Sequence, residues 1–370
     1  MNLTLTEDQE LIQETARKFL EAHTAAADAR SMSKDPMGFS TGLWNEMVKQ
    51  GWTGLAFPEV YGGSGAGFLE ACLLIEQLGW HAIPTPFRPT LLAGSAISQF
   101  GTPDQKEKWL RPICQGRIVG YARAAPGGRW ESSGSTVMAT RTGDQFRLDG
   151  TALFTPFAHA AQDLLIAAHH GSGQLTIFLV EANAPGIVRI PIETVGSDRP
   201  HHLELSRVLV TEDRILGEIN KGSAVVELLS ALGAAITAVH MVGGAQRVLD
   251  LTVEYAGQRQ QFDRPIGSFQ AIQHHCANMA IDVLSARFLA YEAVWRLSEG
   301  LLADTEVSMA KAWVSEAYRR VSALGHQVHG AIGFTKDHDL HFFLREALAS
   351  SLQYGDSDFH WDRVASNLGL

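Results

Sequence analysis

The period of the apolar residues changes twice along the 370-residue chain, at about residues 118 and 218. Before the first change and after the second, apolar residues recur about every three to four positions, as on one face of a helix. Between the changes they form short β-type runs such as 164–168, 175–180 and 203–210, which turn signals separate. The sequence therefore predicts a helical domain over 1–118, a β domain over 119–217 and a helical domain over 218–370.

Several helices can be assigned from this period and from their start signals. Thr6-Glu-Asp-Gln9 is a candidate capping box, in which Thr6 and Gln9 satisfy the first free backbone groups of a helix. Gly233, Gly243 and Gly244 lie inside the longest apolar segment, 225–256, where glycine costs helix propensity unless close helix packing offsets it. The remaining helices are expected over 43–52, 69–80, 89–100, 102–115, 272–298, 308–329 and 340–352.

Composition excludes several classes of protein. The formal net charge of −10 and the 45% of hydrophobic residues favour a globular protein and argue against nucleic acid or an anionic membrane as the main partner. No apolar segment is expected to span a bilayer, and a start without basic residues or an apolar run predicts a cytoplasmic location. Cys72, Cys114 and Cys276 lie far apart in apolar contexts, so they are expected in the core, without disulfides or a cysteine zinc site.

The histidine pairs do not predict a metal centre. His202-Leu-Glu204 and His338-Asp-Leu-His341 could each be imagined as ligand pairs. A zinc site needs at least a third protein ligand, and none stands at a supporting spacing. We therefore expect no metal site and interpret these histidines as surface or capping residues.

Motifs spread along the chain together resemble one enzyme family. They are Gly51-Trp-Thr-Gly-Leu-Ala-Phe-Pro-Glu-Val-Tyr-Gly-Gly-Ser-Gly65, Gly101-Thr-Pro-Asp-Gln-Lys106, Arg259-Gln-Gln-Phe-Asp-Arg-Pro-Ile-Gly-Ser-Phe-Gln270 and Gln327-Val-His-Gly-Ala-Ile-Gly-Phe334. Their conjunction closely resembles the acyl-CoA dehydrogenases, FAD enzymes that desaturate an acyl thioester between Cα and Cβ. The resemblance covers the whole chain. It implies an α+β multidomain fold with an N-terminal helical domain, a middle β-barrel-like domain and a C-terminal four-helix bundle.

The resemblance also implies how FAD is held. Family members form dimers within tetramers, and each FAD spans two subunits. Arg259 would pair with pyrophosphate oxygens through its planar guanidinium, and Phe262 would pack on the adenosine half. The alternative is that Arg259 is a solvated helix-end charge and Phe262 a core residue. The other predicted FAD contacts are Ile266, Gln270, Gln327, Gly330 and Ser357.

The catalytic half of the family's site does not match this chain. Family members carry the base that removes the Cα proton in a Tyr-Glu-Gly-Thr stretch, whereas this chain reads Tyr354-Gly355-Asp356-Ser357. The other position at which some members place the glutamate falls at Gly233. Asp356 is the nearest substitute base, with a solvated charge or a helix cap as the alternative role. Further family features are absent at Ala124-Ala-Pro126, Phe154-Thr-Pro156, Ala231 and Ala234.

The FAD-binding motifs are kept while the catalytic features are lost. The sequence therefore predicts a complex of two unlike chains, in which the other chain is catalytic. The chain resembles the base-less partner in bacterial α2β2 acyl-CoA dehydrogenases, several of which act on CoA thioesters of steroid side chains. It would supply the adenosine side of FAD to a second, catalytic chain. The alternatives are a self-sufficient homotetrameric flavoenzyme that uses Asp356 or another base, and a flavin-free binding or scaffold protein with the same fold.

Overall fold

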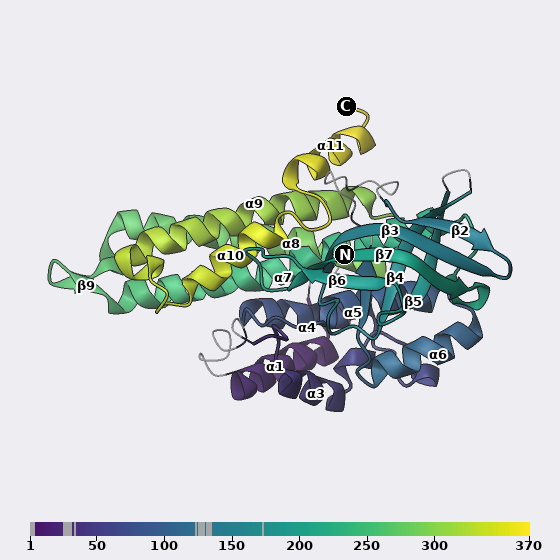
Figure 1. Cartoon of the computed structure of the whole chain (residues 1–370). Coiled ribbons are helices and arrows are strands. Elements are labelled where there is room, and N and C mark those ends of the chain that lie inside the picture. The colour runs from purple at the N-terminus through teal and green to yellow at the C-terminus, as the bar shows by residue number, and fades with distance from the viewer. Residues whose placement is uncertain are drawn as a thin grey trace. The chain divides into compact units, whose positions relative to one another are not determined.

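The computed structural model describes residues 4–24, 32, 35–122, 124, 130, 135–171 and 174–370. Helices precede and follow a central group of strands along the chain (Figure 1). This order confirms the predicted α+β class, with an N-terminal helical part, a middle sheet and a C-terminal helical part.

The N-terminal helices begin at the signals that the sequence contains. Gln9 N donates to Thr6 Oγ1 over 3.3 Å and Thr6 N donates to Gln9 Oε1 over 3.0 Å, so the predicted capping box is present. Thr102 and Gln105 form a second capping box in the same way. The helices are α1 (Glu7–His23), α3 (Thr41–Lys49), α4 (Phe68–Trp80), α5 (Phe87–Phe100) and α6 (Pro103–Cys114), with short 3-10 turns at Trp52–Gly54 and Glu59–Tyr61.

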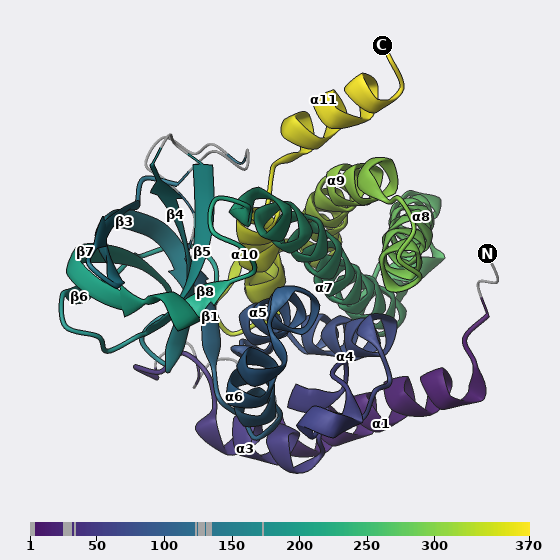
Figure 2. The ribbon, with the colours of Figure 1, turned by 90° about the vertical axis from the view of Figure 1, so that its right-hand side faces the viewer.

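The strands form one mixed sheet in the order β6-β7-β3-β2-β4-β5-β8, and β1 pairs in parallel with β4. Their bounds are β1 (Val119–Ala122), β2 (Met138–Thr142), β3 (Gln145–Pro156), β4 (Asp163–His170), β5 (Gln174–Glu181), β6 (Ile187–Pro191), β7 (Pro200–Thr211) and β8 (Ile215–Leu216). The predicted runs 164–168, 175–180 and 203–210 lie within β4, β5 and β7. Figure 2 shows the curvature of this sheet, in which Leu164–Ala168 of β4 are completely buried.

The C-terminal part contains α7 (Gly222–Gln258), α8 (Gln270–Ser298), α9 (Asp304–His329), α10 (Leu340–Ser350) and α11 (Ser357–Asn367), with a short hairpin of β9 (Gln260–Gln261) and β10 (Arg264–Pro265) after α7. Helices α8 and α9 lie side by side (Figure 1). No helix is expected from the sequence where α11 forms. This helix buries only His360 and Val364, so its apolar period is weak.

Packing divides the chain into two compact units. One contains Met1–Ser31, Phe68–Ile83 and Gly233–Leu370, and the other contains Met32–Gly67 and Pro84–Leu232. Each unit therefore combines segments that are distant in sequence. The domain borders predicted at 118 and 218 follow the changes in secondary structure instead, and they stay predictions.

Glycines allow α7 to approach its neighbours closely, as the sequence predicted. A Cβ on Gly243 would lie 1.9 Å from Glu76 O of α4, and one on Gly244 would lie 2.3 Å from the Tyr318 hydroxyl of α9. Gly79 of α4 approaches His240 O of α7 in the same manner, with 2.1 Å from its ideal Cβ position. The helix-propensity cost of these glycines is therefore offset by backbone contacts that no larger residue permits.

Helix α7 corrects the expectation that no segment could span a bilayer. An 18-residue window of this helix has a mean hydropathy of 1.8, and the helix is long enough to cross a membrane. However, 78% of that window is buried inside the protein. We therefore interpret α7 as a core helix, whose apolar surface faces protein.

The cysteines only partly follow the prediction. Cys72 is 0% exposed and Cys114 is 9% exposed, which confirms both as core residues. Cys276 is only half-buried on α8, so the core prediction is wrong there. All three are free thiols, and burial raises the pKa of Cys114 to about 11, which keeps that thiol protonated and unreactive.

Candidate functional site

The hairpin after α7 presents an aromatic side chain in a strained backbone conformation. Phe262 and Asp263, the two residues between β9 and β10, have φ angles of 55° and 61°. Two positive φ angles define a type I′ turn, for which Asn-Gly is preferred and a bulky residue is costly. Phe262 is nevertheless 85% exposed, so the alternative that it is a core residue is wrong. Strain and exposure together make Phe262 a candidate for contact with another molecule.

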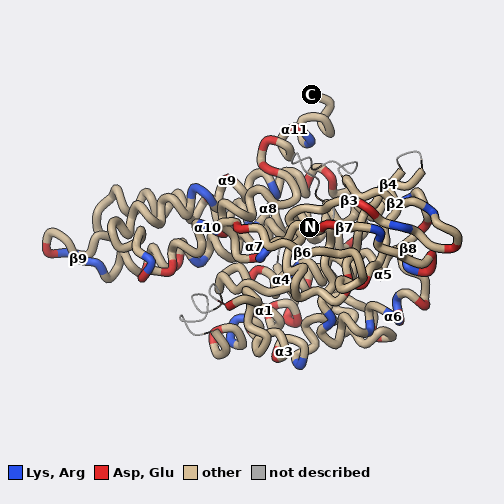
Figure 3. The backbone as a smooth tube through the Cα atoms, viewed as in Figure 1, with Lys and Arg blue, Asp and Glu red and all other residues tan. Residues whose placement is uncertain are grey.

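Arg259 stands at the base of this hairpin with its side chain exposed. Its backbone N donates to Tyr255 O and its carbonyl accepts from Ile266 N, both over 2.8 Å, so the main chain at this position is fixed. Within the part of the chain that the structure describes, its guanidinium makes no hydrogen bond or ion pair. Figure 3 shows basic and acidic residues at the hairpin labelled β9. The guanidinium is therefore free to bind an anion.

The end of α9 lies beside the end of α7. His329, the last residue of α9, stacks on Tyr255 of α7 with 4.4 Å between the ring centroids. Gly330 follows with φ 64° and ψ −140°, and no other atom lies within 4 Å of its ideal Cβ position. Gln327 is exposed one turn earlier. The structure thus brings together the Gln327–Gly330 segment and the last turn of α7, which leads into Arg259.

Ile266 and Gln270 complete this region. Ile266 is half-buried in the short turn after β10, and Gln270 is the exposed first residue of α8. Phe269 packs edge-on against Phe262 with ring centroids 6.0 Å apart, and the Arg264 guanidinium lies 4.1 Å above the Phe269 ring. These contacts hold the hairpin in place. Arg259, Phe262, Ile266, Gln270, Gln327 and Gly330 form what we call the nucleotide end of the bundle.

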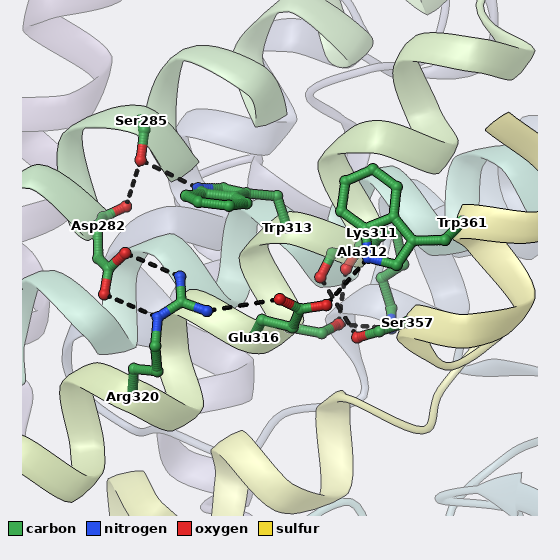
Figure 4. A network of polar contacts seen from close by, with 10 residues as sticks. Asp282, Ser285, Lys311, Ala312, Trp313, Glu316, Arg320, Ser357 and Trp361 are labelled. Atoms are coloured by element: carbon green, nitrogen blue, oxygen red, sulfur yellow. Dashed lines mark hydrogen bonds and ion pairs between the residues drawn. The ribbon is translucent and has the colours of Figure 1, made fainter. Parts of the chain in front are cut away.

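Ser357 does not belong to the nucleotide end. Its hydroxyl donates to Ala312 O of α9 over 3.4 Å, as Figure 4 shows. Ala312 and Gly330 are 18 residues apart in sequence, and a helical rise of 1.5 Å per residue separates them by about 27 Å. The predicted FAD contacts therefore lie in two separate places.

Asp356 caps helix α11. Its Oδ1 accepts a hydrogen bond from Phe359 N over 2.9 Å, as N-cap residues do. The neighbouring Gly355 has a φ of 110°, a conformation that favours glycine, and is buried. Gly355 has no side chain to accept a proton, and the Asp356 carboxylate is already hydrogen-bonded to its own helix.

Lys311 holds the 354–357 segment in place. It is not among the site residues predicted from the sequence. This lysine of α9 is 0% exposed. Its Nζ donates to Gly355 O over 2.8 Å and to Ser351 O and Ser315 Oγ over 3.1 Å each. Burial lowers the pKa of Lys311 to about 7, and the nearby Asp356 carboxylate opposes this shift. The sequence did contain a signal that could have identified Lys311, because this lysine lies on the apolar face of the predicted helix 308–329.

His360 of α11 supports the same segment. It is 4% exposed, and its Nε2 lies 3.0 Å from Tyr354 O, which requires the proton to be on Nε2 for a hydrogen bond. Burial, together with the positive charge of Lys311, lowers the pKa of His360 to about 4. Trp361 Nε1 donates to Glu316 Oε1 of α9 over 2.9 Å, which ties α11 to the bundle (Figure 4).

We expect acid to destabilise the protein through His360 between about pH 6.5 and 4. The imidazole titrates near 6.5 when unfolded and near 4 when folded, so in this window only the unfolded chain binds the proton. The stability that neutral His360 contributes is therefore full above pH 6.5 and is lost as the pH falls through 4, by up to about 3 kcal/mol. Urea unfolding at several pH values measures this loss. His360→Gln, which can still donate to Tyr354 O, should show a flatter curve; an unchanged slope would contradict the assignment.

The other sequence departures lie in the sheet and on α7. Phe154 of β3 has a φ of 51° and is 54% exposed, next to a register shift between Ala152 and Thr155 in the pairing with β7. Thr155 is 0% exposed, and its Oγ1 has no hydrogen-bond partner among the described residues. Ala124 bridges to Leu153, whereas Ala125 and Pro126 lie outside the described residues. The side chains of Ala231 and Ala234 of α7 are methyl groups, which can make no hydrogen bond or ion pair.

The histidines do not gather into a metal site within the ranges that the structure describes, where no group of three or more His, Cys, Asp or Glu side chains has a suitable arrangement. His338 Nδ1 instead accepts from Leu340 N over 3.2 Å, at the start of α10. His202 lies on β7 among alternating strand residues.

Comparison with known proteins gives one family along the chain. Residues 6–117 match the acyl-CoA dehydrogenase N-terminal domain and residues 220–369 match the acyl-CoA dehydrogenase C-terminal domain. Acyl-CoA dehydrogenase FadE27 of Mycobacterium tuberculosis is 30% identical over 100% of this chain and 99% of its own length. The crystal structure of the ChsE4-ChsE5 complex from Mycobacterium tuberculosis superposes with a TM-score of 0.92 at 31% identity, covering 100% of this chain and 99% of that one.

A second solved relative, a variant of the Tcur3481-Tcur3483 steroid ACAD, superposes with a TM-score of 0.90 at 30% identity and covers 99% of both chains. Relatives of this fold include a structure described as an FAD-dependent dehydrogenase, with a TM-score of 0.90 at 26% identity and coverage of 100% of both chains. The family models, the full-length relatives and the shared fold agree. The chain therefore belongs to the acyl-CoA dehydrogenase family of FAD-dependent flavoproteins.

Proposed function

We propose that this chain is the base-less subunit of a heteromeric FAD-dependent acyl-CoA dehydrogenase. It holds the adenosine half of an FAD whose flavin lies in a second, catalytic chain. The single observation that carries the proposal is the 354–357 segment, where Gly355 is buried with a φ of 110° and Asp356 is engaged as the cap of α11. The 354–357 segment is therefore unsuitable for catalysis, whereas the nucleotide end is exposed and well formed.

The residues at the nucleotide end suit the pyrophosphate and adenosine of FAD. Arg259 offers a planar, permanently charged fork that matches two phosphate oxygens. Gly330 leaves open space at its Cβ position, which allows a ligand to approach the backbone. Phe262 and Ile266 offer apolar side chains for the adenine, while Gln270 and Gln327 offer amides. When bound, FAD supplies the acceptor for the hydride that leaves the substrate Cβ.

Asp356 is poorly placed to act as a base. An N-cap carboxylate stabilises its helix by about 1 kcal/mol. Turning Asp356 toward a substrate would also leave the N–H of Phe359 without its acceptor. A homotetramer that uses Asp356 as its base requires this rearrangement, whereas the proposed subunit role requires none. The base would instead come from the catalytic chain.

An exposed apolar stripe on α8 supports association with another chain. Ile281, Leu284 and Phe288 are 64%, 52% and 44% exposed. Their spacing of three and four residues places them on one face of the helix. A soluble chain gains by covering such a stripe, and a homologous chain has matching helices with which to do so. The ChsE4-ChsE5 relative is described as a complex of two proteins.

We infer that the substrate class is an acyl-CoA thioester, with steroid side-chain thioesters as the first candidates. The catalytic chain would remove the Cα proton while its bound flavin accepts the hydride. The support for the steroid class is the likeness to a relative described as a steroid ACAD. We propose that the complex acts in the cytoplasm.

Co-expression with a neighbouring dehydrogenase gene tests the proposal. We expect equal amounts of the two chains in a tetramer, about half the flavin of a homotetramer, and turnover that neither chain gives alone. Subunit ratio, flavin absorbance and dehydrogenation of an acyl-CoA panel are the measurements. If the purified chain alone binds a full complement of flavin and turns over, the proposal is wrong. A colourless complex would instead favour the flavin-free scaffold alternative.

Asp356→Asn provides the matched control in the same complex. Asparagine is as good an N-cap as aspartate, so the fold is kept while the carboxylate is removed. We expect turnover close to that of the wild-type complex. A homotetramer with Asp356 as its general base would instead lose about 10²–10⁴-fold in turnover.

A further inference from the structure

We propose that residues 354–360, the closing segment, fill both positions at which a base could be mounted in this chain and thereby fix it in the partner role. This inference rests on the proposed function and deepens it. The base would then be absent for a structural reason as well as a chemical one. Restoring a glutamate at either position would not restore a catalytic site.

The first position, Gly355, has no room for a side chain. An ideal Cβ there would lie 2.5 Å from Phe359 Cδ1 and 2.7 Å from His360 Nε2, which is closer than real Cβ atoms approach other atoms. His360 is buried and its Nε2 lies 3.0 Å from Tyr354 O, so turning the ring away would break this buried hydrogen bond. Both obstructing rings belong to the first turn of α11. A glutamate at 355 would therefore displace that turn.

The second position, Gly233 of α7, is filled by the same segment. An ideal Cβ on Gly233 would lie 2.3 Å from Cε1, 2.5 Å from Cδ1 and 2.7 Å from Cζ of Tyr354. Tyr354 also packs against a buried cluster from α7, α8 and the start of α9, and its backbone has a φ of 56°. The members of that cluster are Ala234, Ala293, Ala303, Val307 and Ala310.

The two closures depend on one another. The Tyr354 ring fills the space beside Gly233, while the Tyr354 carbonyl is bound by His360, the residue that obstructs Gly355. The next carbonyl, that of Gly355, is bound by Lys311 Nζ over 2.8 Å. Opening either position would break buried hydrogen bonds at the other. The closing segment therefore acts as one rigid unit.

A comparison of glycine-to-alanine variants of the full chain, purified with its partner or alone, tests the closure. Gly300 is the matched control, because it has a φ of 67° and no other atom within 4 Å of its Cβ position. We expect Gly355→Ala to lower Tm by at least about twice as much as Gly300→Ala, since it adds a clash to the left-handed strain. A loss no larger than that of the control overturns the proposal.

A double-mutant cycle separates the clash from the backbone strain at position 355. Phe359→Ala removes the atom nearest to the added methyl, so Gly355→Ala should cost less Tm in that background than in the wild type. In the Gly300→Ala background, Phe359→Ala should act additively. Additive effects in both backgrounds overturn the proposal.

If Gly355→Ala yields no folded protein, the second position decides the question. Gly233→Ala should lower Tm, and Tyr354→Leu in the same chain should reduce that loss; additivity would again contradict the closure. These thermal measurements need no turnover. A failed co-expression therefore leaves the closure testable, and a failed cycle leaves the subunit role standing.

Discussion

Replacing Lys311 with methionine should lower the free energy of unfolding by roughly 1–3 kcal/mol at about pH 6, where the loss of three buried hydrogen bonds is partly offset by the removal of a charge that burial disfavours. At this pH, below the Lys311 pKa of about 7, the amine carries three protons and has three acceptors, Ser315 Oγ, Ser351 O and Gly355 O. Methionine fills a similar volume but donates no hydrogen bond. The variant would therefore leave buried oxygens of α9, α10's end and the closing segment without a donor.

Urea unfolding followed by circular dichroism measures this loss. Lys336→Met is the matched control, because Lys336 is exposed and the same chemical change there costs only a few tenths of a kcal/mol. Because Lys311 binds the Gly355 carbonyl, the variant should also lose hydrogen-exchange protection in residues 354–360. A Lys311→Met protein within about 1 kcal/mol of the control would show that the buried ammonium is not needed for stability.

Replacing Arg259 with alanine should weaken FAD binding to the two-chain complex by roughly 10–100-fold. Hydrogen bonds between charged partners contribute about 1.5–3 kcal/mol, and the free guanidinium is the strongest anion ligand at the nucleotide end. The affinity of the Arg259→Lys complex for FAD should lie between those of the wild type and Arg259→Ala, since lysine keeps the charge and loses the planar fork. Flavin retained after dialysis and the fluorescence-derived Kd for FAD are the measurements.

Arg319→Ala is the control for Arg259, because it removes the same charge from an exposed site on α9. We expect that variant to retain its flavin. The Arg259→Ala chain should keep its Tm without FAD, since its exposed side chain makes no hydrogen bond or ion pair with the described residues. A complex that retains flavin equally well with alanine at 259 would remove Arg259 from the cofactor site.

The sequence predicts the long elements well because their apolar periods are strong. The capping box at Thr6 and the strand run 164–168 are local signals that tertiary packing does not override. Gly243 was interpreted as a packing residue, and its approach to Glu76 O confirms this. Helix α11 was missed because only two of its residues are buried, although its cap Asp356 was considered.

The candidate site is less predictable, because its geometry depends on distant segments. The positive φ of Phe262 and its 85% exposure follow from a hairpin turn that the Gln-Phe-Asp-Arg sequence does not favour. The contact between Lys311 and Gly355 O joins residues 44 positions apart. The separation of Ser357 from the nucleotide end likewise became visible only when the length of α9 was known.

The unit that contains residues 233–370 also contains helices from the start of the chain, and this affects how the chain folds during synthesis. Helices α1 and α4 belong to the same unit as residues 233–370, so they leave the ribosome long before their partners. Until α7 and α8 arrive, α1 is the native partner of α4 within this unit that is already present, and the α4 surface around Gly79 that contacts α7 lacks its native covering. A nascent chain in this state exposes apolar surface to which chaperones can bind. Premature termination before residue 233 would yield an aggregation-prone fragment.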